Sequence, residues 1–231
     1  MAKFTFDIDV YSDTVCPWCY IGKMGLDSAM ETHRKRYPED EFNLVWKPFI
    51  LYPNAKVSAY DKKASFFAKF GHNTPALFER VAKAGAPYGI TFLWKGRTGS
   101  SHDSHKLIML AGDRDAAAAA AASPTVSKQS VFLGALFRGI FEQAQDISDR
   151  SFLIPTALAA GLAADEAEVL AYLDSDLAAA RVSPAETTRA RREAGVTAVP
   201  SYVVQGRFKV GGMQAPEVFL GLFERIRGRE G

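Results

Sequence analysis

The feature that most constrains this chain is a pair of cysteines separated by two residues, in the stretch Cys16-Pro17-Trp18-Cys19. They are the only cysteines among 231 residues. Random placement would give this spacing in roughly 1% of such chains, so a chemical reason is expected. The C-x-x-C pattern is typical of redox-active dithiols, but it is also half of a structural zinc site. Inert burial of two small apolar side chains is the third interpretation.

The sequence around the cysteines favours the redox interpretation. Residues 4–11 alternate apolar and polar side chains, which predicts a half-buried strand. A helix is expected to follow, with Cys16 near its cap and Pro17 at its first position, where a missing N–H costs nothing. The unpaired N–H groups and the dipole of a helix N-terminus stabilise a thiolate, which is the reactive form of cysteine. Cys19 would lie one turn further on, close enough to resolve a mixed disulfide formed at Cys16.

A metal site is not expected. Zinc would normally need a second pair of ligands besides the two cysteines. The chain has four histidines, and only His102 and His105 have a plausible helical spacing. The sequence therefore predicts thiol chemistry without a metal ion.

Composition excludes several other classes of protein. A hydrophobic content of 48% is ample for a core, and the length permits one large domain or two small ones. With 28 basic and 26 acidic residues and no basic run, the sequence gives no argument for a nucleic-acid partner, and none is expected. The N-terminus leads directly into a strand pattern, and no segment has the character of a signal peptide or a membrane span. We therefore expect no membrane partner and a cytoplasmic location, where a disulfide is more often catalytic than structural.

The two ends of the chain predict strands, and the middle predicts helices. A helix to about residue 37 and a strand over residues 42–49 complete a parallel βαβ unit, with Pro48 marking the end of its strand or an edge position. After residue 194, a strand over 199–204, a turn at 205–206 and a strand over 207–210 predict a hairpin, and Ala215-Pro216 begins a closing helix. Between these ends, helices are expected over residues 59–70, 74–84, 104–122, 165–173 and 176–194. Two further helices are expected to begin at residues 123–124 and at residue 149. Pro155 is expected to kink or restart its helix.

This order of elements resembles the thioredoxin fold with a helical insertion, and more closely the DsbA-like thioredoxin family. The nearest branch includes FrnE-type oxidoreductases, 2-hydroxychromene-2-carboxylate isomerases and kappa-class glutathione transferases. Five stretches carry the resemblance, namely residues 9–23, 46–49, 103–107, 195–201 and 210–214. The first and the fourth are quite specific, and together the five cover the chain from end to end.

The resemblance implies an α/β fold class and a division of the chain into two domains. Residues 1–57 and 195–231 would form the thioredoxin-like domain, with the βαβ unit at one end and the ββα unit at the other. Residues 58–194 would form a large all-helical insertion domain. Homodimers occur in the family, so a homodimer is one assembly that the resemblance allows.

The resemblance also implies a role for each matching residue of the motif. Cys16 would be the nucleophile, and Cys19 would be the more buried resolving cysteine. Pro200 matches the cis-proline that faces the cysteine pair in the family.

Three neighbours of these residues would contact the substrate. Val199, just before the cis-proline, would offer backbone hydrogen bonds to an extended or mixed-disulfide substrate. Pro17 and Trp18, between the cysteines, would tune thiolate stability and substrate access.

Two further residues are candidates for an auxiliary role, and two positions depart from relatives. Asp13 would lie near Cys16 as a functional carboxylate or would merely cap a loop, and His105 stands where relatives often carry a histidine. Ile50 replaces an acidic residue of the FrnE-type motif. The isomerase and kappa-transferase branch generally has serine or threonine where this chain has Cys16, so the complete C-x-x-C favours dithiol redox chemistry.

Three functions follow as expectations. The leading one is a thiol–disulfide oxidoreductase that cycles its C-P-W-C dithiol through a mixed disulfide at Cys16, with a protein or small-molecule thiol as substrate. The alternatives are a glutathione-dependent isomerase or transferase acting on an aromatic small molecule, with polyketide tailoring as one setting, and a non-catalytic binding protein of the same fold. No tightly bound cofactor is expected, and glutathione is a candidate co-substrate.

Overall fold

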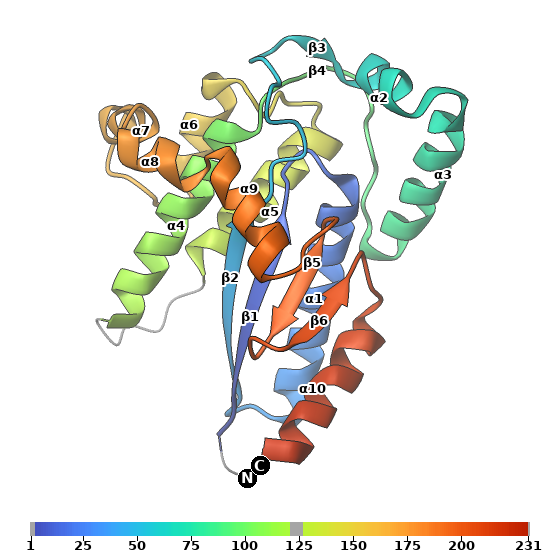
Figure 1. The fold of residues 1–231 in the computed structure, drawn as a ribbon, viewed down its shortest axis with the longest axis vertical. Coiled ribbons are helices and arrows are strands. Elements are labelled where there is room, and N and C mark those ends of the chain that lie inside the picture. Colours follow the sequence, from blue (N-terminus) through green and yellow to red (C-terminus); the bar gives the residue numbers. More distant parts are fainter. Residues whose placement is uncertain (1–2, 121–126, 231) are drawn as a thin grey trace.

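The computed structural model describes residues 3–120 and 127–230, and its centre is a four-stranded mixed sheet in the order β2-β1-β5-β6 (Figure 1). The first strand, β1 (Thr5–Ser12), pairs in parallel with β2 (Glu41–Pro48). On its other side β1 pairs antiparallel with β5 (Ser201–Val204), which forms a hairpin with β6 (Phe208–Gly211). The strands from the two ends of the chain therefore form one sheet, and β2, which ends at Pro48, lies at an edge, as predicted.

The two faces of the sheet have different covers. Residues Phe6, Ile8 and Val10 of β1 are buried and belong to the main core. The helices α1 (Pro17–Arg36) and α10 (Pro216–Glu230) supply apolar side chains to that same core. The apolar residues of the alternating pattern in residues 4–11 thus form the face of the sheet that packs against these two helices.

The opposite face of the sheet carries a smaller apolar cluster. Tyr11 of β1 and Val203 of β5 pack there with Ala190 from α9 (Pro184–Glu193). In Figure 1 this short helix crosses in front of the strands. The insertion thus contributes α9 to the cover of this second face of the sheet.

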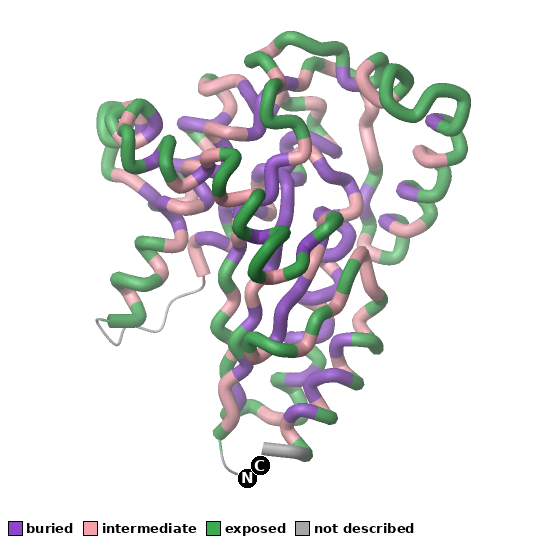
Figure 2. The backbone as a smooth tube through the Cα atoms, in the orientation of Figure 1, coloured by how far each residue is buried: buried purple, intermediate pink, exposed green. Residues whose placement is uncertain are grey.

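The segment between β2 and β5 is mainly helical. Its helices are α2 (Lys62–Phe70), α3 (Thr74–Gly85), α4 (His102–Ala120), α5 (Lys128–Glu142), α6 (Arg150–Ala159), α7 (Glu166–Leu173), α8 (Asp176–Arg181) and α9, with short 3-10 turns at Gly71–Asn73 and Ala86–Tyr88. Figure 2 shows that buried positions concentrate in the central strands and α1, whereas α2 and the far end of α4 are largely exposed. The predicted thioredoxin fold with a helical insertion is confirmed, but the insertion is not all-helical, because it also contains a two-stranded sheet of β3 (Tyr60–Asp61) and β4 (Arg97–Thr98).

One hydrophobic core joins the sheet to this insertion. It includes Phe6 of β1 and Phe223 of α10, and it continues through Trp46 of β2 to Phe137 of α5 and Leu153 of α6. The division of the chain at residues 57 and 195 into two domains stays a prediction.

Helix boundaries in the insertion differ from the prediction at two prolines. The predicted single helix over residues 176–194 was wrong, because Val182 and Ser183 separate α8 from α9. Ser183 is extended, with φ −65° and ψ 158°, since the residue before a proline is pushed out of the helical region. Of the kink or restart expected at Pro155, the restart does not occur, because α6 continues through this residue. The buried side chains of Leu153 and Ile154 offset the cost of a proline inside the helix.

Two other boundaries also differ. The first insertion helix begins at Lys62 rather than at residue 59, because β3 (Tyr60–Asp61) pairs with β4 (Arg97–Thr98). The predicted helix start at residues 123–124 lies outside the described residues. In the described part α5 begins at Lys128, where the hydroxyl of Ser127 accepts a hydrogen bond from the Ser130 N–H.

The Gln129 side chain forms hydrogen bonds with the backbone on the outer edge of β2. The amide oxygen of Gln129 accepts from the backbone N–H of Trp46 at 2.8 Å, and its amide nitrogen donates to the Trp46 carbonyl at 3.0 Å. The same amide nitrogen lies 3.1 Å from the Ile108 carbonyl. Because an edge strand leaves its outer backbone groups unpaired, the buried glutamine replaces one residue of a neighbouring strand.

Replacing Gln129 with leucine is therefore expected to destabilise the protein by about 2–5 kcal/mol, because the N–H and the carbonyl of Trp46 would be buried without partners. Urea unfolding followed by circular dichroism would measure the loss. Gln143→Leu, at an exposed position, is the matched control and should change stability by less than about 0.5 kcal/mol. Equal stabilities of the two variants would show that the Gln129 amide does not support the edge strand.

Candidate active site

The two cysteines lie at the start of α1, as predicted. Cys16 is the N-cap residue, with φ −98° and ψ 111°, and Pro17 occupies the first helical turn. The backbone N–H of Cys16 donates to the Asp13 carbonyl at 3.1 Å, and its carbonyl accepts from the Cys19 N–H at 3.0 Å. The Cys16 sulfur makes no capping hydrogen bond to the helix. The backbone thus holds Cys16 in place and leaves its sulfur available at the positive end of the helix.

Burial distinguishes the two thiols. Both cysteines are unpaired thiols, and Cys16 is 7% exposed whereas Cys19 is completely buried. Burial, together with the neighbouring Cys16, raises the pKa of the Cys19 thiol well above its usual value. Cys16 is therefore the thiol that a substrate can reach, and Cys19 lies behind it.

The segment before β5 closes over the Cys16 sulfur. The peptide bond between Val199 and Pro200 is cis, and the Cys16 thiol lies 3.8 Å from the Val199 carbonyl oxygen, to which it donates. The carbonyl of Pro200 accepts from the Gly212 N–H at 2.8 Å, which ties this segment to the end of β6. Residues separated by more than 180 positions in the sequence thus meet at the sulfur atom.

Asp13, in the loop that precedes Cys16, forms a buried pair with His105 of α4. The Nε2 atom of His105 lies 3.2 Å from Oδ1 of Asp13. The other carboxylate oxygen accepts from the Leu51 N–H at 2.7 Å, and Oδ1 lies 3.4 Å from the Val15 N–H. Asp13 therefore joins three segments, which are the loop between β1 and α1, the loop after β2, and α4.

The environment of Asp13 favours its ionised form. Complete burial alone would raise the pKa of this carboxyl. The hydrogen bond and the charge of His105, with the Leu51 N–H, outweigh burial and lower the pKa below its usual value. Asp13 is thus a buried anion that His105 stabilises.

A second buried contact holds the same loop against α4. The hydroxyl groups of Thr14 and Ser104 lie 2.9 Å apart, and the Ser104 hydroxyl also donates to the Ser101 carbonyl at 2.7 Å. Sequence reasoning missed both residues. No local signal could have identified the pair, because its members are 90 positions apart and neither belongs to a motif.

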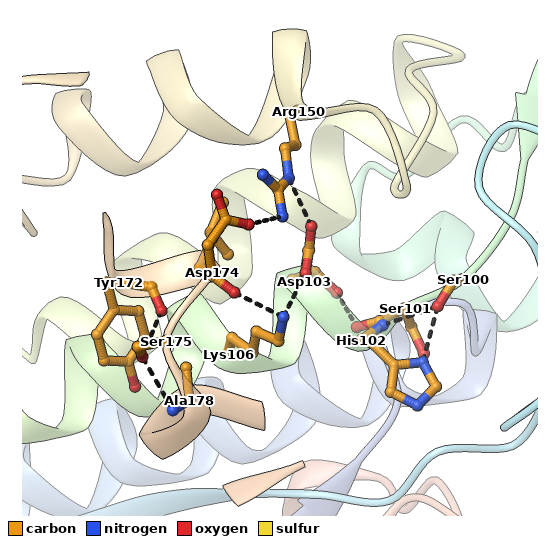
Figure 3. A network of polar contacts seen from close by, with 12 residues as sticks. Ser100, Ser101, His102, Asp103, Lys106, Arg150, Tyr172, Asp174, Ser175 and Ala178 are labelled. Atoms are coloured by element: carbon orange, nitrogen blue, oxygen red, sulfur yellow. Dashed lines mark hydrogen bonds and ion pairs between the residues drawn. The ribbon is translucent and has the colours of Figure 1, made fainter. Parts of the chain in front are cut away.

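The start of α4 is itself held by charged contacts (Figure 3). Asp103 pairs with Lys106 at 3.0 Å and with Arg150 of α6 at 2.8 Å. Arg150 also pairs with Asp174, and Lys106 donates to the Leu173 carbonyl. This network fixes the helix end that brings His105 to Asp13.

His102 faces a different partner from His105. In Figure 3 the His102 ring turns towards Ser100, and its Nδ1 lies 2.7 Å from the Ser100 hydroxyl. Within residues 3–120 and 127–230, no group of three or more histidines, cysteines or acidic residues is arranged to hold a metal ion. The same residues include no helix that is long and apolar enough to cross a membrane.

Trp18 stands at the rim of the site. Its side chain is half-buried, and the guanidinium group of Arg80 from α3 lies 5.8 Å from the centre of its ring. Pro17 is buried. Of the residues named from the sequence, Cys16, Val199 and Pro200 meet at one place with Cys19 behind them, and Asp13 and His105 form the support below.

The chain is similar to known proteins both in sequence and in structure. The sequence matches the DsbA-like thioredoxin domain over residues 7–224. A solved structure of a probable DsbA oxidoreductase from Streptomyces coelicolor has a TM-score of 0.78 and 26% identity, covering 98% of this chain and 92% of the other. No curated protein matches the sequence.

Two more distant structures share the fold. The cytosolic disulfide reductase DsbM from Pseudomonas aeruginosa, solved with GSH, has a TM-score of 0.62 at 14% identity, covering 96% of this chain and 99% of that protein. A 2-hydroxychromene-2-carboxylate isomerase has a TM-score of 0.59 at 14% identity, covering 96% of this chain and 95% of the other. Because the domain match extends over nearly the whole length, this chain belongs to the DsbA-like thioredoxin family, which comprises disulfide oxidoreductases and isomerases.

Proposed function

We propose that the protein is a thiol–disulfide oxidoreductase that cycles Cys16 and Cys19 between dithiol and disulfide. The observation that carries the proposal is the placement of the two sulfurs. Cys16 is at the N-cap of α1, 7% exposed and 3.8 Å from the Val199 carbonyl, with the buried Cys19 one turn behind it. This arrangement gives one accessible sulfur for the substrate and one protected sulfur for resolution.

In the oxidising direction, a substrate thiolate attacks the Cys16 sulfur of the disulfide. A substrate–Cys16 bond forms, the Cys16–Cys19 bond breaks, and the electron pair of the broken bond stays on Cys19. A second substrate thiolate then attacks the substrate sulfur, so that the substrate disulfide forms and Cys16 leaves as a thiolate. Val199 and Pro200, beside Cys16, would hold the backbone of the mixed disulfide.

In the reducing direction, the same steps occur in reverse. The Cys16 thiolate attacks a substrate disulfide, and Cys19 then attacks Cys16 and releases the second substrate thiol. Which direction prevails depends on the reduction potential of the pair against that of its compartment. Glutathione is the co-substrate that we propose for regenerating the pair, while the cytoplasmic location and the homodimer stay predictions.

The proposed mechanism is tested by trapping its intermediate. A Cys19→Ala variant incubated with glutathione disulfide should gain the mass of one glutathione, located at Cys16, because no second thiol remains to expel it. The wild-type protein should instead accumulate an intramolecular disulfide. If the variant forms no adduct, Cys16 is not the nucleophile and the proposal fails.

The similarity in fold to a 2-hydroxychromene-2-carboxylate isomerase supports a second candidate function. A glutathione-dependent isomerase or transferase acting on an aromatic compound would use glutathione at the site without a Cys16–Cys19 disulfide. Turnover of such a compound that persists in a Cys16→Ser variant and requires glutathione would favour this second function.

A further inference from the structure

Two buried hydroxyl groups on the sheet have no hydrogen-bond partner among the described residues. Ser12, at the end of β1, is 3% exposed, and Tyr202, on β5, is completely buried. Neither the Ser12 Oγ nor the Tyr202 hydroxyl is hydrogen-bonded within residues 3–120 and 127–230. An unpaired buried hydroxyl costs free energy relative to an apolar group of the same shape, so two of them close together call for an explanation.

The register of the sheet places both hydroxyls on the same face. Tyr202 lies directly opposite Val10 in the antiparallel pair of β1 and β5. Ser12 follows Val10 by two residues, so its side chain points to the same side of the sheet. This is the face that α1 covers, and Ser12 and Tyr202 are diagonal neighbours on it.

A glycine in α1 admits the tyrosine hydroxyl. A Cβ atom at Gly22 would lie 2.3 Å from the Tyr202 hydroxyl and 3.0 Å from Cγ of Pro200. Gly22 follows Cys19 by three residues and therefore lies next to it on the same side of the helix. The hydroxyl thus reaches the part of α1 that carries the resolving cysteine.

The pKa shifts of Tyr202 and Cys19 also indicate that the hydroxyls lie near the thiols. After burial, the Cys19 and Cys16 thiols are the groups that most raise the pKa of the Tyr202 hydroxyl. Burial and Cys16 raise the pKa of Cys19, and the Ser12 hydroxyl is among the few groups that act to lower it. The Tyr202 hydroxyl therefore lies within the electrostatic reach of both thiols, and the Ser12 hydroxyl acts on Cys19 from the neighbouring strand.

We propose that the hydroxyls of Ser12 and Tyr202 donate hydrogen bonds to the Cys19 sulfur when it carries negative charge. This inference rests on the proposed function and adds to it the groups that stabilise Cys19. In the oxidising direction, the electron pair of the broken Cys16–Cys19 bond passes to Cys19, and the two hydroxyls stabilise that leaving group. In the reducing direction, they stabilise the Cys19 thiolate that attacks Cys16.

The experiment measures how fast the Cys16–Cys19 disulfide is opened by excess glutathione in wild-type protein and in the variants Ser12→Ala, Tyr202→Phe and their double mutant. Each single change should slow opening by about threefold to tenfold and the double change by more than about tenfold, because a poorer leaving thiolate leaves more slowly. Tyr20→Phe is the control, since the Tyr20 residue adjoins Cys19 but its hydroxyl donates to Glu142 at 2.6 Å. The control should open at the wild-type rate.

A second readout separates this role from a merely structural one. In a Cys16→Ala background Cys19 is the only thiol, and the pH at which the ultraviolet absorbance of its thiolate appears should move upward when either hydroxyl is removed. Ser12→Thr, which retains the hydroxyl, should keep the wild-type opening rate. Wild-type rates in the double mutant would overturn the inference, as would equal slowing by Ser12→Thr and Ser12→Ala. Absence of any Cys16–Cys19 disulfide in the wild-type protein would instead refute the proposed function itself.

Discussion

Replacing Cys16 with serine is expected to reduce thiol–disulfide exchange by about a thousandfold or more, because a serine hydroxyl cannot replace a thiolate as nucleophile at neutral pH. Replacing Cys19 with serine should give a different defect. That variant retains the attacking sulfur, so it should form mixed disulfides and release them slowly. Reduction of a glutathionylated peptide, followed by the appearance of free peptide thiol, would measure both variants.

The contrast between the two variants is what the geometry predicts. Cys16 is the sulfur next to the Val199 carbonyl, whereas Cys19 is completely buried. Circular dichroism should show that both proteins are folded, since serine is close in size to cysteine. Equal activity of the Cys16→Ser variant and the wild type would contradict the assignment of Cys16 as nucleophile.

The second large effect is expected at Asp13. Asp13→Ala should lower the free energy of unfolding by about 3–5 kcal/mol, because it leaves His105 buried without its partner. The same change removes the acceptor of the Leu51 N–H. Asp7→Ala is the control, because Asp7 is exposed and its carboxylate accepts a surface hydrogen bond from Asn43. Urea unfolding at pH 7 would compare the two variants, and equal losses would show that the buried pair is not stabilising.

The pH dependence of stability gives this prediction a definite sign. The pKa of Asp13 is lowered in the folded protein, so the unfolded chain binds its proton more readily. The stabilisation is therefore complete above the unfolded value of about 3.9 and is lost as the pH falls through the lower folded value. The stability of Asp13→Asn protein should fall less steeply in acid than that of the wild type. A steeper fall in the variant would contradict the sign.

The parts of the fold that follow from local pattern could be predicted. The alternation in residues 4–11 corresponds to the buried face of β1, and Pro17 marks the first turn of α1. Pro184 also indicates a break, because a proline restricts the residue before it. The break between α8 and α9 was nevertheless not predicted, because the residues on both sides of it have a helical pattern.

The parts that depend on distant pairs could not be predicted. Gln129 completes the edge of β2 at Trp46, which is 83 positions away, and a buried glutamine has no sequence signature. The pairing of Asp13 with His105 across 92 positions was also beyond any pattern, although the family resemblance pointed to each residue separately. Ser12 belongs to a stretch that carries the family resemblance, but no role was expected for it or for Tyr202, because a serine and a tyrosine in strands look like ordinary strand residues until the register is known.

A redox titration of the wild-type protein against mixtures of glutathione and its disulfide, with free thiols trapped and counted by mass, tests the dithiol mechanism. The mechanism predicts one two-electron transition in which the Cys16 and Cys19 thiols disappear together and a disulfide forms within one chain. Its midpoint would give the reduction potential and thus the direction in which the protein works. A protein that forms no intramolecular disulfide at any ratio would contradict the dithiol mechanism.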